Sequence, residues 1–64
     1  MKLNGTPITL TQPQPLQSVL LAHQFDPTRV AVELNGKIVP KSAYETTTVT
    51  NGDHLEVVSF VGGG

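Results

Sequence analysis

The sequence predicts an α+β domain in which one helix packs on one face of a mixed sheet of four to five strands. Residues 16–25 carry apolar side chains at helical spacing, and the segments before and after them alternate apolar with polar residues, as strands do. Turn signals, of which Asn35-Gly36 is the strongest, separate the alternating segments. The order β-β-α-β-β suits one helix over one sheet, because a lone helix covers a single face.

Two hairpins are expected from these patterns. In residues 1–10, short alternating segments flank a turn signal at Gly5-Thr6. In the second hairpin, residues 30–34 and 37–39 flank Asn35-Gly36, and both of these turn residues tolerate positive φ.

The helix is predicted over residues 16–25. Pro15 suits its first turn, because the N–H that proline lacks would have no partner there, and Thr11 or Gln14 could cap it. The helix is expected to stop at Asp26-Pro27, since the residue before a proline is disfavoured in the α region.

The last third of the chain predicts one more strand after two irregular segments. Residues 42–45 can form a short helical turn, and residues 46–50 form a β-prone connector. A turn at residues 51–53 follows, in which Asp53 is expected to bond to its own neighbouring backbone. The final strand is predicted over residues 54–61.

The apolar positions of these elements give a predicted core. Its members are Leu3, Ile8, Leu10, Leu16, Val19, Leu20, Val30, Val32, Leu34, Ile38, Leu55 and Val57. A single helix leaves the other sheet face uncovered, so Glu56, Val58 and Phe60 of the last strand are expected to face solvent. We interpret Val58 and Phe60, with Val61, as a docking patch, because large apolar side chains on a surface often mark an interaction site.

Three glycines follow this strand, so we predict a single domain over residues 1–61 and a flexible tail of Gly62, Gly63 and Gly64. Three residues extend at most about 10 Å, and a tail without side chains is narrow enough to enter a channel. The terminal carboxylate of Gly64 is therefore the predicted working group, against the alternative that the tail is a frayed chain end.

Composition limits the classes of function. A chain of 64 residues has a small core with little room for a deep substrate cavity. Its net charge of −1 and its scattered basic residues argue against a nucleic-acid-binding surface. The absence of cysteine excludes disulfides and thiolate chemistry. No signal peptide or membrane-spanning run is expected, and the cytoplasm is the expected compartment.

Several motifs together carry a family resemblance over the whole chain. They are the segment 32–41, the Tyr44 that follows it, the turn 51–53, the strand segment 55–58 and the ending 61–64. In these residues the sequence resembles the ThiS family, the sulfur carriers of thiamine biosynthesis, which are small β-grasp proteins similar in fold to ubiquitin. The family usually ends in a glycine pair, so the third glycine here is a small variation.

The resemblance implies a carrier rather than an enzyme, and no cofactor bound to the chain itself. The Gly64 carboxylate would be adenylated by an E1-like enzyme of the ThiF type using ATP and magnesium. A sulfur donor system with a cysteine desulfurase would convert it to a thiocarboxylate, and a thiazole synthase of the ThiG type would take the sulfur. The residues agree with a carrier that depends on a separate nucleotide-binding enzyme, since the chain has no glycine-rich phosphate-binding loop of its own.

Other constellations predict weaker sites. His23 and His54 are far apart and lack a carboxylate at ligand spacing, so a metal site is not expected. The serines lack the sequence context of a catalytic triad. Lys41 is expected to be a solvated charge, and the alternative is that it contacts a partner protein.

Three other functions stay open at this level. The chain could be a related sulfur carrier for molybdopterin or another pathway, although such carriers are usually longer. It could be a protein modifier joined to target lysines through Gly64, or an interaction module with an inert tail. Deleting Gly63 and Gly64 separates the inert-tail hypothesis from the others.

Overall fold

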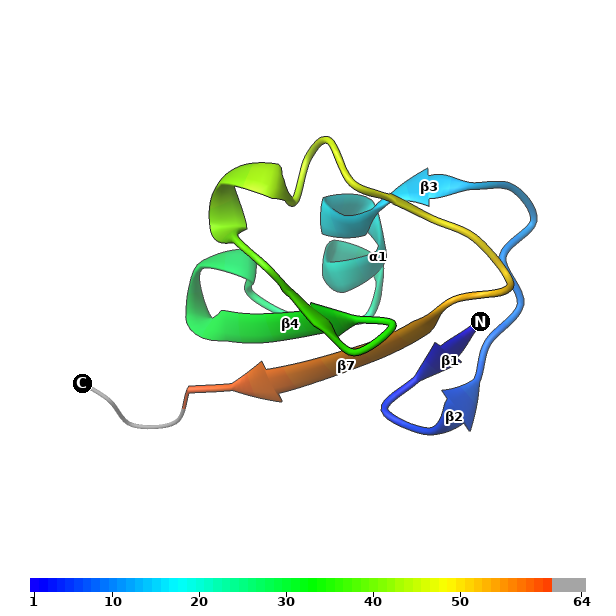
Figure 1. Ribbon diagram of the computed structural model, residues 1–64, viewed down its shortest axis with the longest axis horizontal. Helices are drawn as coiled ribbons and strands as arrows, with labels where there is room; N and C mark the ends of the chain where they lie inside the picture. The colour runs from blue at the N-terminus through cyan, green and yellow to red at the C-terminus, as the bar shows by residue number, and fades with distance from the viewer. Residues whose placement is uncertain (61–64) are drawn as a thin grey trace.

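The computed structural model describes residues 1–60, so Val61 and the three glycines lie outside the described residues. A five-stranded mixed sheet carries helix α1 (Leu16–Ala22) on one face (Figure 1), which confirms the predicted fold class. The strands are β1 (Lys2–Leu3), β2 (Thr6–Pro7), β3 (Gln14–Pro15), β4 (Val30–Leu34), β5 (Lys37–Val39), β6 (Thr48–Val49) and β7 (His54–Ser59), and the 3₁₀ turns are η1 (Pro27–Arg29) and η2 (Lys41–Ala43).

The last strand in sequence, β7, lies at the centre of the sheet. The strand order is β2-β1-β7-β4-β5, with β7 parallel to β1 and antiparallel to β4. The edge strands β2 and β5 are the outer arms of the two hairpins. A separate two-stranded sheet pairs β3 with β6, and β6 falls within the expected β-prone connector. β7 is therefore paired with β1 at its first two residues and with β4 from Leu55 to Ser59.

Two-residue Asn-Gly turns close both hairpins. Asn35 and Gly36 have φ angles of 52° and 84°, the left-handed conformation predicted for this pair. The first hairpin turns at Asn4 and Gly5, with φ angles of 50° and 83°, one residue earlier than expected. The Asn4 side chain accepts from the Val57 N–H (2.7 Å) and donates to the Val57 carbonyl (3.1 Å), which ties this turn to β7.

The first N–H groups of helix α1 pair with backbone carbonyls of a segment that is distant in sequence. The N–H groups of Leu16 and Gln17 donate to the carbonyls of Thr47 (2.7 Å) and Tyr44 (3.0 Å), which satisfies two otherwise unpaired donors. Pro15 lies just before the helix, at its N-cap position, and no side chain caps it. The prediction that Thr11 or Gln14 caps the helix is therefore wrong.

The helix ends three residues earlier than predicted. Gln24 adopts a left-handed φ of 62°, its N–H donates to the Leu21 carbonyl (3.1 Å), and the Phe25 N–H donates to the Leu20 carbonyl (2.9 Å). These two bonds form a Schellman motif, which closes a helix through a left-handed residue. Asp26 instead caps η1, where its carboxylate accepts from the Thr28 N–H at 2.9 Å.

The core lies between α1 and the sheet. Its buried members are Met1, Leu3, Leu10, Leu16, Val19, Leu20, Val30, Val32, Tyr44, Val49, Leu55 and Val57. Ile8 and Leu34 are only partly buried, and Met1, Tyr44 and Val49 were not expected. The placement of Ile38 in the core is wrong, because its side chain is 78% exposed. Ile38 is paired with the exposed Glu33, so it faces the side of the sheet away from α1.

Candidate functional site

The central strand β7 presents two different faces, as its alternation predicted. Leu55 and Val57 are buried beneath α1, whereas Glu56 and Val58 are exposed, and Phe60 after the strand is 58% exposed. The expected parity of this strand is confirmed. Val61, the third residue of the predicted docking patch, lies outside the described residues, as do the tail glycines.

The backbone holds Phe60 at the end of the sheet. Its N–H donates to the Arg29 carbonyl at 2.8 Å, which continues the pairing of β7 with the β4 side beyond Ser59. The Lys41 Nζ lies 5.5 Å from the centroid of the Phe60 ring, within the range of a cation–π interaction. The last described residue before the tail is thus held by both its backbone and its side chain.

Lys41 makes bonds inside the protein rather than projecting freely into solvent. Its Nζ donates to the Val30 carbonyl (2.9 Å) and the Pro27 carbonyl (3.3 Å), and it lies 6.0 Å from the centroid of the Tyr44 ring. The buried Tyr44 hydroxyl also donates to the Val30 carbonyl at 3.2 Å, and burial raises the pKa of this hydroxyl. Lys41 therefore joins η2, β4 and Phe60, and its contact with a partner stays a prediction.

The sheet face opposite α1 mixes apolar and acidic side chains. Register places Ala31 beside Val58, and Glu33 between Ile38 and Glu56. All five side chains are exposed. Ile38 belongs to this face and not to the core, and the two-residue Asn-Gly turn before it is the sequence signal that shows this. Such a turn pairs the third residue before it with the third residue after it, so the partner of Val32 is Val39 and not Ile38.

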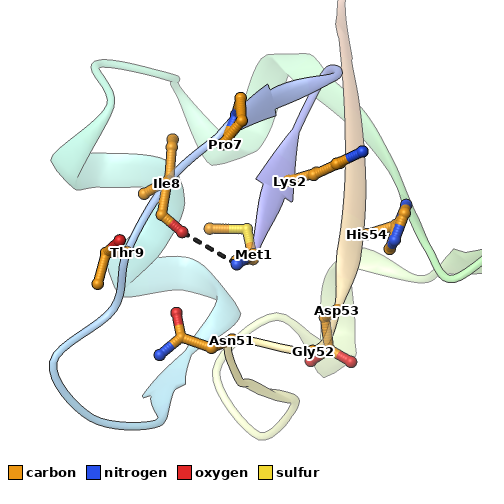
Figure 2. Close-up of a pocket in the computed structure, with 9 residues that line it drawn as sticks. All are labelled: Met1, Lys2, Pro7, Ile8, Thr9, Asn51, Gly52, Asp53 and His54. Atoms are coloured by element: carbon orange, nitrogen blue, oxygen red, sulfur yellow. Dashed lines mark hydrogen bonds between the residues drawn. The ribbon is translucent and has the colours of Figure 1, made fainter.

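A hollow of about 540 Å³ lies at the other end of β7, beside the start of the chain (Figure 2). Its lining residues are Met1, Lys2, Pro7, Ile8, Thr9, Asn51, Gly52, Asp53 and His54. The Asp53 carboxylate accepts from the Asn35 side chain (2.9 Å) and the Thr50 N–H (2.8 Å), which confirms its predicted role in the turn and lowers its pKa. This carboxylate is thus committed to structure.

Neither histidine belongs to a metal-binding cluster among residues 1–60. His23 follows the last turn of α1, and His54 begins β7. No group of three or more histidine, aspartate or glutamate side chains gathers in the described part of the chain. Nor is any helix within residues 1–60 long and apolar enough to cross a membrane.

Comparison with known proteins identifies relatives over the full chain. The model of the ThiS family matches residues 1–64. An uncharacterized protein, ycf40, of Pyropia yezoensis is 39% identical over 64 residues, which cover 100% of this chain and 90% of that protein. The sulfur carrier protein ThiS of Bacillus subtilis is 37% identical over 49 residues, which cover 77% of this chain and 74% of that protein.

Two further similarities concern the pathway and the fold. A thiazole synthase of Paramagnetospirillum magneticum is 40% identical over 62 residues, which cover 97% of this chain but only 19% of that protein. The crystal structure of the thiamine biosynthesis protein ThiS from Geobacter metallireducens superposes with a TM-score of 0.82 at 35% identity, covering 98% of this chain and 96% of that one. Sequence, fold and the exposed face of the terminal strand agree, and the chain belongs to the ThiS family of sulfur carriers of thiamine biosynthesis.

Proposed function

We propose that this protein carries sulfur as a thiocarboxylate on Gly64 for the formation of a thiazole ring. The observation that carries the proposal is the arrangement of β7. An exposed aromatic residue, Phe60, directly follows this central strand, and the sequence then reaches the terminal carboxylate through Val61 and three glycines. Family membership supports the same reading.

Activation of the carboxylate requires a second protein. A C-terminal carboxyl group has a pKa of about 3.3–3.7 and is ionised at neutral pH, so its oxygen can bond to the α-phosphorus of ATP while pyrophosphate leaves. A persulfide sulfur then attacks the acyl carbon and AMP leaves. A thiol finally cleaves the S–S bond and releases the thiocarboxylate. The ThiF-type enzyme binds ATP and magnesium and catalyses the adenylation, and a cysteine desulfurase supplies the sulfur.

The acceptor of the sulfur is a thiazole synthase of the ThiG type. This assignment is supported by the Paramagnetospirillum magneticum thiazole synthase, which includes a segment similar to this chain within one polypeptide. A carrier placed beside the synthase in a single chain would deliver its sulfur without a separate encounter. The protein described here would make the same delivery after binding.

The carrier recognises its partners through the exposed end of β7. Val58 offers an exposed apolar side chain on the face that α1 leaves uncovered, and Phe60 is exposed just beyond the strand, beside Lys41. Val61 continues the same segment. Lys41 contributes by holding the Phe60 ring in place and adds a positive charge at the edge of this patch. The patch aligns the chain so that Gly62, Gly63 and Gly64 enter the partner's active site.

Intact mass spectrometry tests this function. The protein is incubated with the ThiF-type enzyme of its host, ATP, magnesium, a cysteine desulfurase and cysteine. We expect a mass increase equal to the replacement of one oxygen by sulfur, localised to Gly64 by fragmentation. A variant lacking Gly63 and Gly64 serves as the matched control and should show no change. An unchanged mass for the full chain, with an adenylating enzyme active on another carrier, would overturn the proposal.

A further inference from the structure

Each of the three asparagines of this chain is followed directly by a glycine. The pairs are Asn4-Gly5, Asn35-Gly36 and Asn51-Gly52. Asparagine is a thermolabile residue, and a following glycine favours its deamidation because no side chain hinders the approach of the glycine nitrogen to the asparagine Cγ. The fold decides which of the three amides can react, since each of them is hydrogen-bonded.

Two of the three amides are held by backbone groups that are partly buried. The Asn4 side chain pairs with both the N–H (2.7 Å) and the carbonyl (3.1 Å) of Val57. The Asn51 side chain pairs in the same way with the N–H and the carbonyl of Leu10, at 2.7 Å each. Release of either side chain would leave a partly buried N–H and carbonyl without partners, which costs free energy. These bonds therefore protect Asn4 and Asn51.

The Asn35 side chain is held by groups whose bonds water can replace. Its Nδ2 donates to the Asp53 carboxylate at 2.9 Å and its Oδ1 accepts from the His54 N–H at 2.9 Å, and both bonds are exposed. Solvent can take over both partners when the side chain rotates away. The neighbouring Gly36 is open as well, because a methyl group on its Cα would meet no atom within 4 Å. Asn35 is thus the asparagine whose amide leaves its partners at the lowest cost.

The turn at Asn35 and Gly36 can also accommodate the cyclic intermediate of deamidation. Attack by the Gly36 nitrogen on the Asn35 Cγ requires the peptide plane between the two residues to rotate. Their φ angles of 52° and 84° are those of a type I′ turn, and rotation of this plane gives a type II′ turn, in which only the first residue keeps a positive φ. Gly36 adopts either sign of φ without strain, and both turn types fit a two-residue hairpin. The intermediate can therefore form while β4 and β5 stay paired.

We propose that Asn35 is a site of spontaneous deamidation, whose products weaken the contact between the β4–β5 hairpin and the start of β7. The Gly36 nitrogen forms a bond to the Asn35 Cγ and gives up its proton, and the side-chain nitrogen leaves as ammonia. Water then opens the succinimide ring at either carbonyl, which yields aspartate or isoaspartate and returns a proton to the Gly36 nitrogen.

The two products disturb the fold in different ways. Aspartate puts a carboxylate where the amide donates to Asp53, so a hydrogen bond becomes a contact between two like charges. Isoaspartate adds one carbon to the backbone of the two-residue turn that sets the pairing of β4 with β5. Both changes occur beside His54, the first residue of β7.

Peptide mapping by mass spectrometry tests the choice of Asn35. The full chain is incubated in mildly alkaline water enriched in oxygen-18, so that each newly deamidated residue carries the label. In the native protein we expect Asn35 to deamidate at least about tenfold faster than Asn4 or Asn51. In concentrated urea the three sites should react at similar rates, because the hydrogen bonds that distinguish them are lost. A native rate at Asn35 no greater than that at Asn4 or Asn51 would overturn the proposal, as would an unreactive Asn35 under conditions in which the unfolded chain reacts.

Two variants test the effect of the aspartate product. Asn35→Asp should lower the melting temperature at neutral pH by several degrees. The double variant Asn35→Asp/Asp53→Asn exchanges the amide and the carboxylate, so a donor again faces an acceptor and most of the lost melting temperature should return. A melting temperature of Asn35→Asp equal to that of the wild type, or no recovery in the double variant, would overturn the proposed effect. Because the reaction needs only water, these outcomes are independent of sulfur transfer by Gly64.

Discussion

Replacing Lys41 with methionine tests how the end of the central strand is held. Methionine preserves the unbranched apolar stem but removes the ammonium group. The variant therefore loses the bonds to the Val30 and Pro27 carbonyls and the cation–π contact with Phe60. The Tyr44 hydroxyl still donates to the Val30 carbonyl, so that acceptor keeps one partner and the loss is moderated.

The expected loss of stability follows from these contacts. A hydrogen bond from a charged group contributes about 1.5–3 kcal/mol, and an exposed cation–π contact about 0.5–1 kcal/mol. Because Lys41 is exposed to solvent, water competes for its ammonium group, and we expect a net loss of about 1–2 kcal/mol. In a domain of this size the melting temperature should fall by roughly 5–12 °C.

Thermal unfolding followed by circular dichroism measures this change. Lys37→Met is the matched control, because Lys37 is an exposed lysine of edge strand β5 with no side-chain bond to the described residues, and it should melt like the wild type. Lys41→Arg keeps the charge and should retain part of the stability. Equal melting temperatures for Lys41→Met and the wild type would refute the conclusion that Lys41 fixes Phe60.

Three further predictions follow from the observed contacts. Gln24→Gly should stabilise the protein by about 0.5–1 kcal/mol in urea unfolding, because glycine adopts the left-handed φ of this position without strain. Hydrogen bonds from Asn35 and Thr50 lower the pKa of Asp53 in the folded state, so their stabilisation is complete above the unfolded pKa of about 3.9 and is lost as pH falls through the lower folded value. In Asp53→Asn, urea unfolding midpoints measured between pH 2 and 7 should show a weaker acid dependence. Phe60→Ser should raise the KM for adenylation several-fold with a smaller fall in melting temperature than Lys41→Met, because the ring is largely exposed and loses only its cation–π contact with Lys41; a larger thermal destabilisation would contradict the docking role.

Local patterns predicted the elements and the faces of β7 because both depend on residues close in sequence. Alternation along a strand is enough to place Leu55 inward and Val58 outward. The prediction that Ile38 lies in the core was wrong because it rested on hydrophobicity alone. The two-residue turn pairs Ile38 with Glu33, and this register places Ile38 on the exposed face. The helix start could not be read locally, since its carbonyl partners Thr47 and Tyr44 lie 31 and 27 residues beyond the N–H groups that they accept from. The pairing of Glu33 with Glu56 could not be read locally either, because it joins two strands that are distant in sequence.

The geometry of β7 explains why a carrier would place its working end after a central strand. β7 is paired with β1 at its start and with β4 from Leu55 to Ser59. The Asn4 side chain bonds to Val57, and the Phe60 N–H adds a bond to Arg29 just beyond the strand. Four residues follow Phe60, and at about 3.3–3.6 Å each they reach at most roughly 14 Å. An adenylating partner that docks on Phe60 would therefore have to hold the α-phosphorus of its nucleotide within that distance. A well-positioned strand end, rather than a long tail, would then determine whether the carboxylate reaches its target.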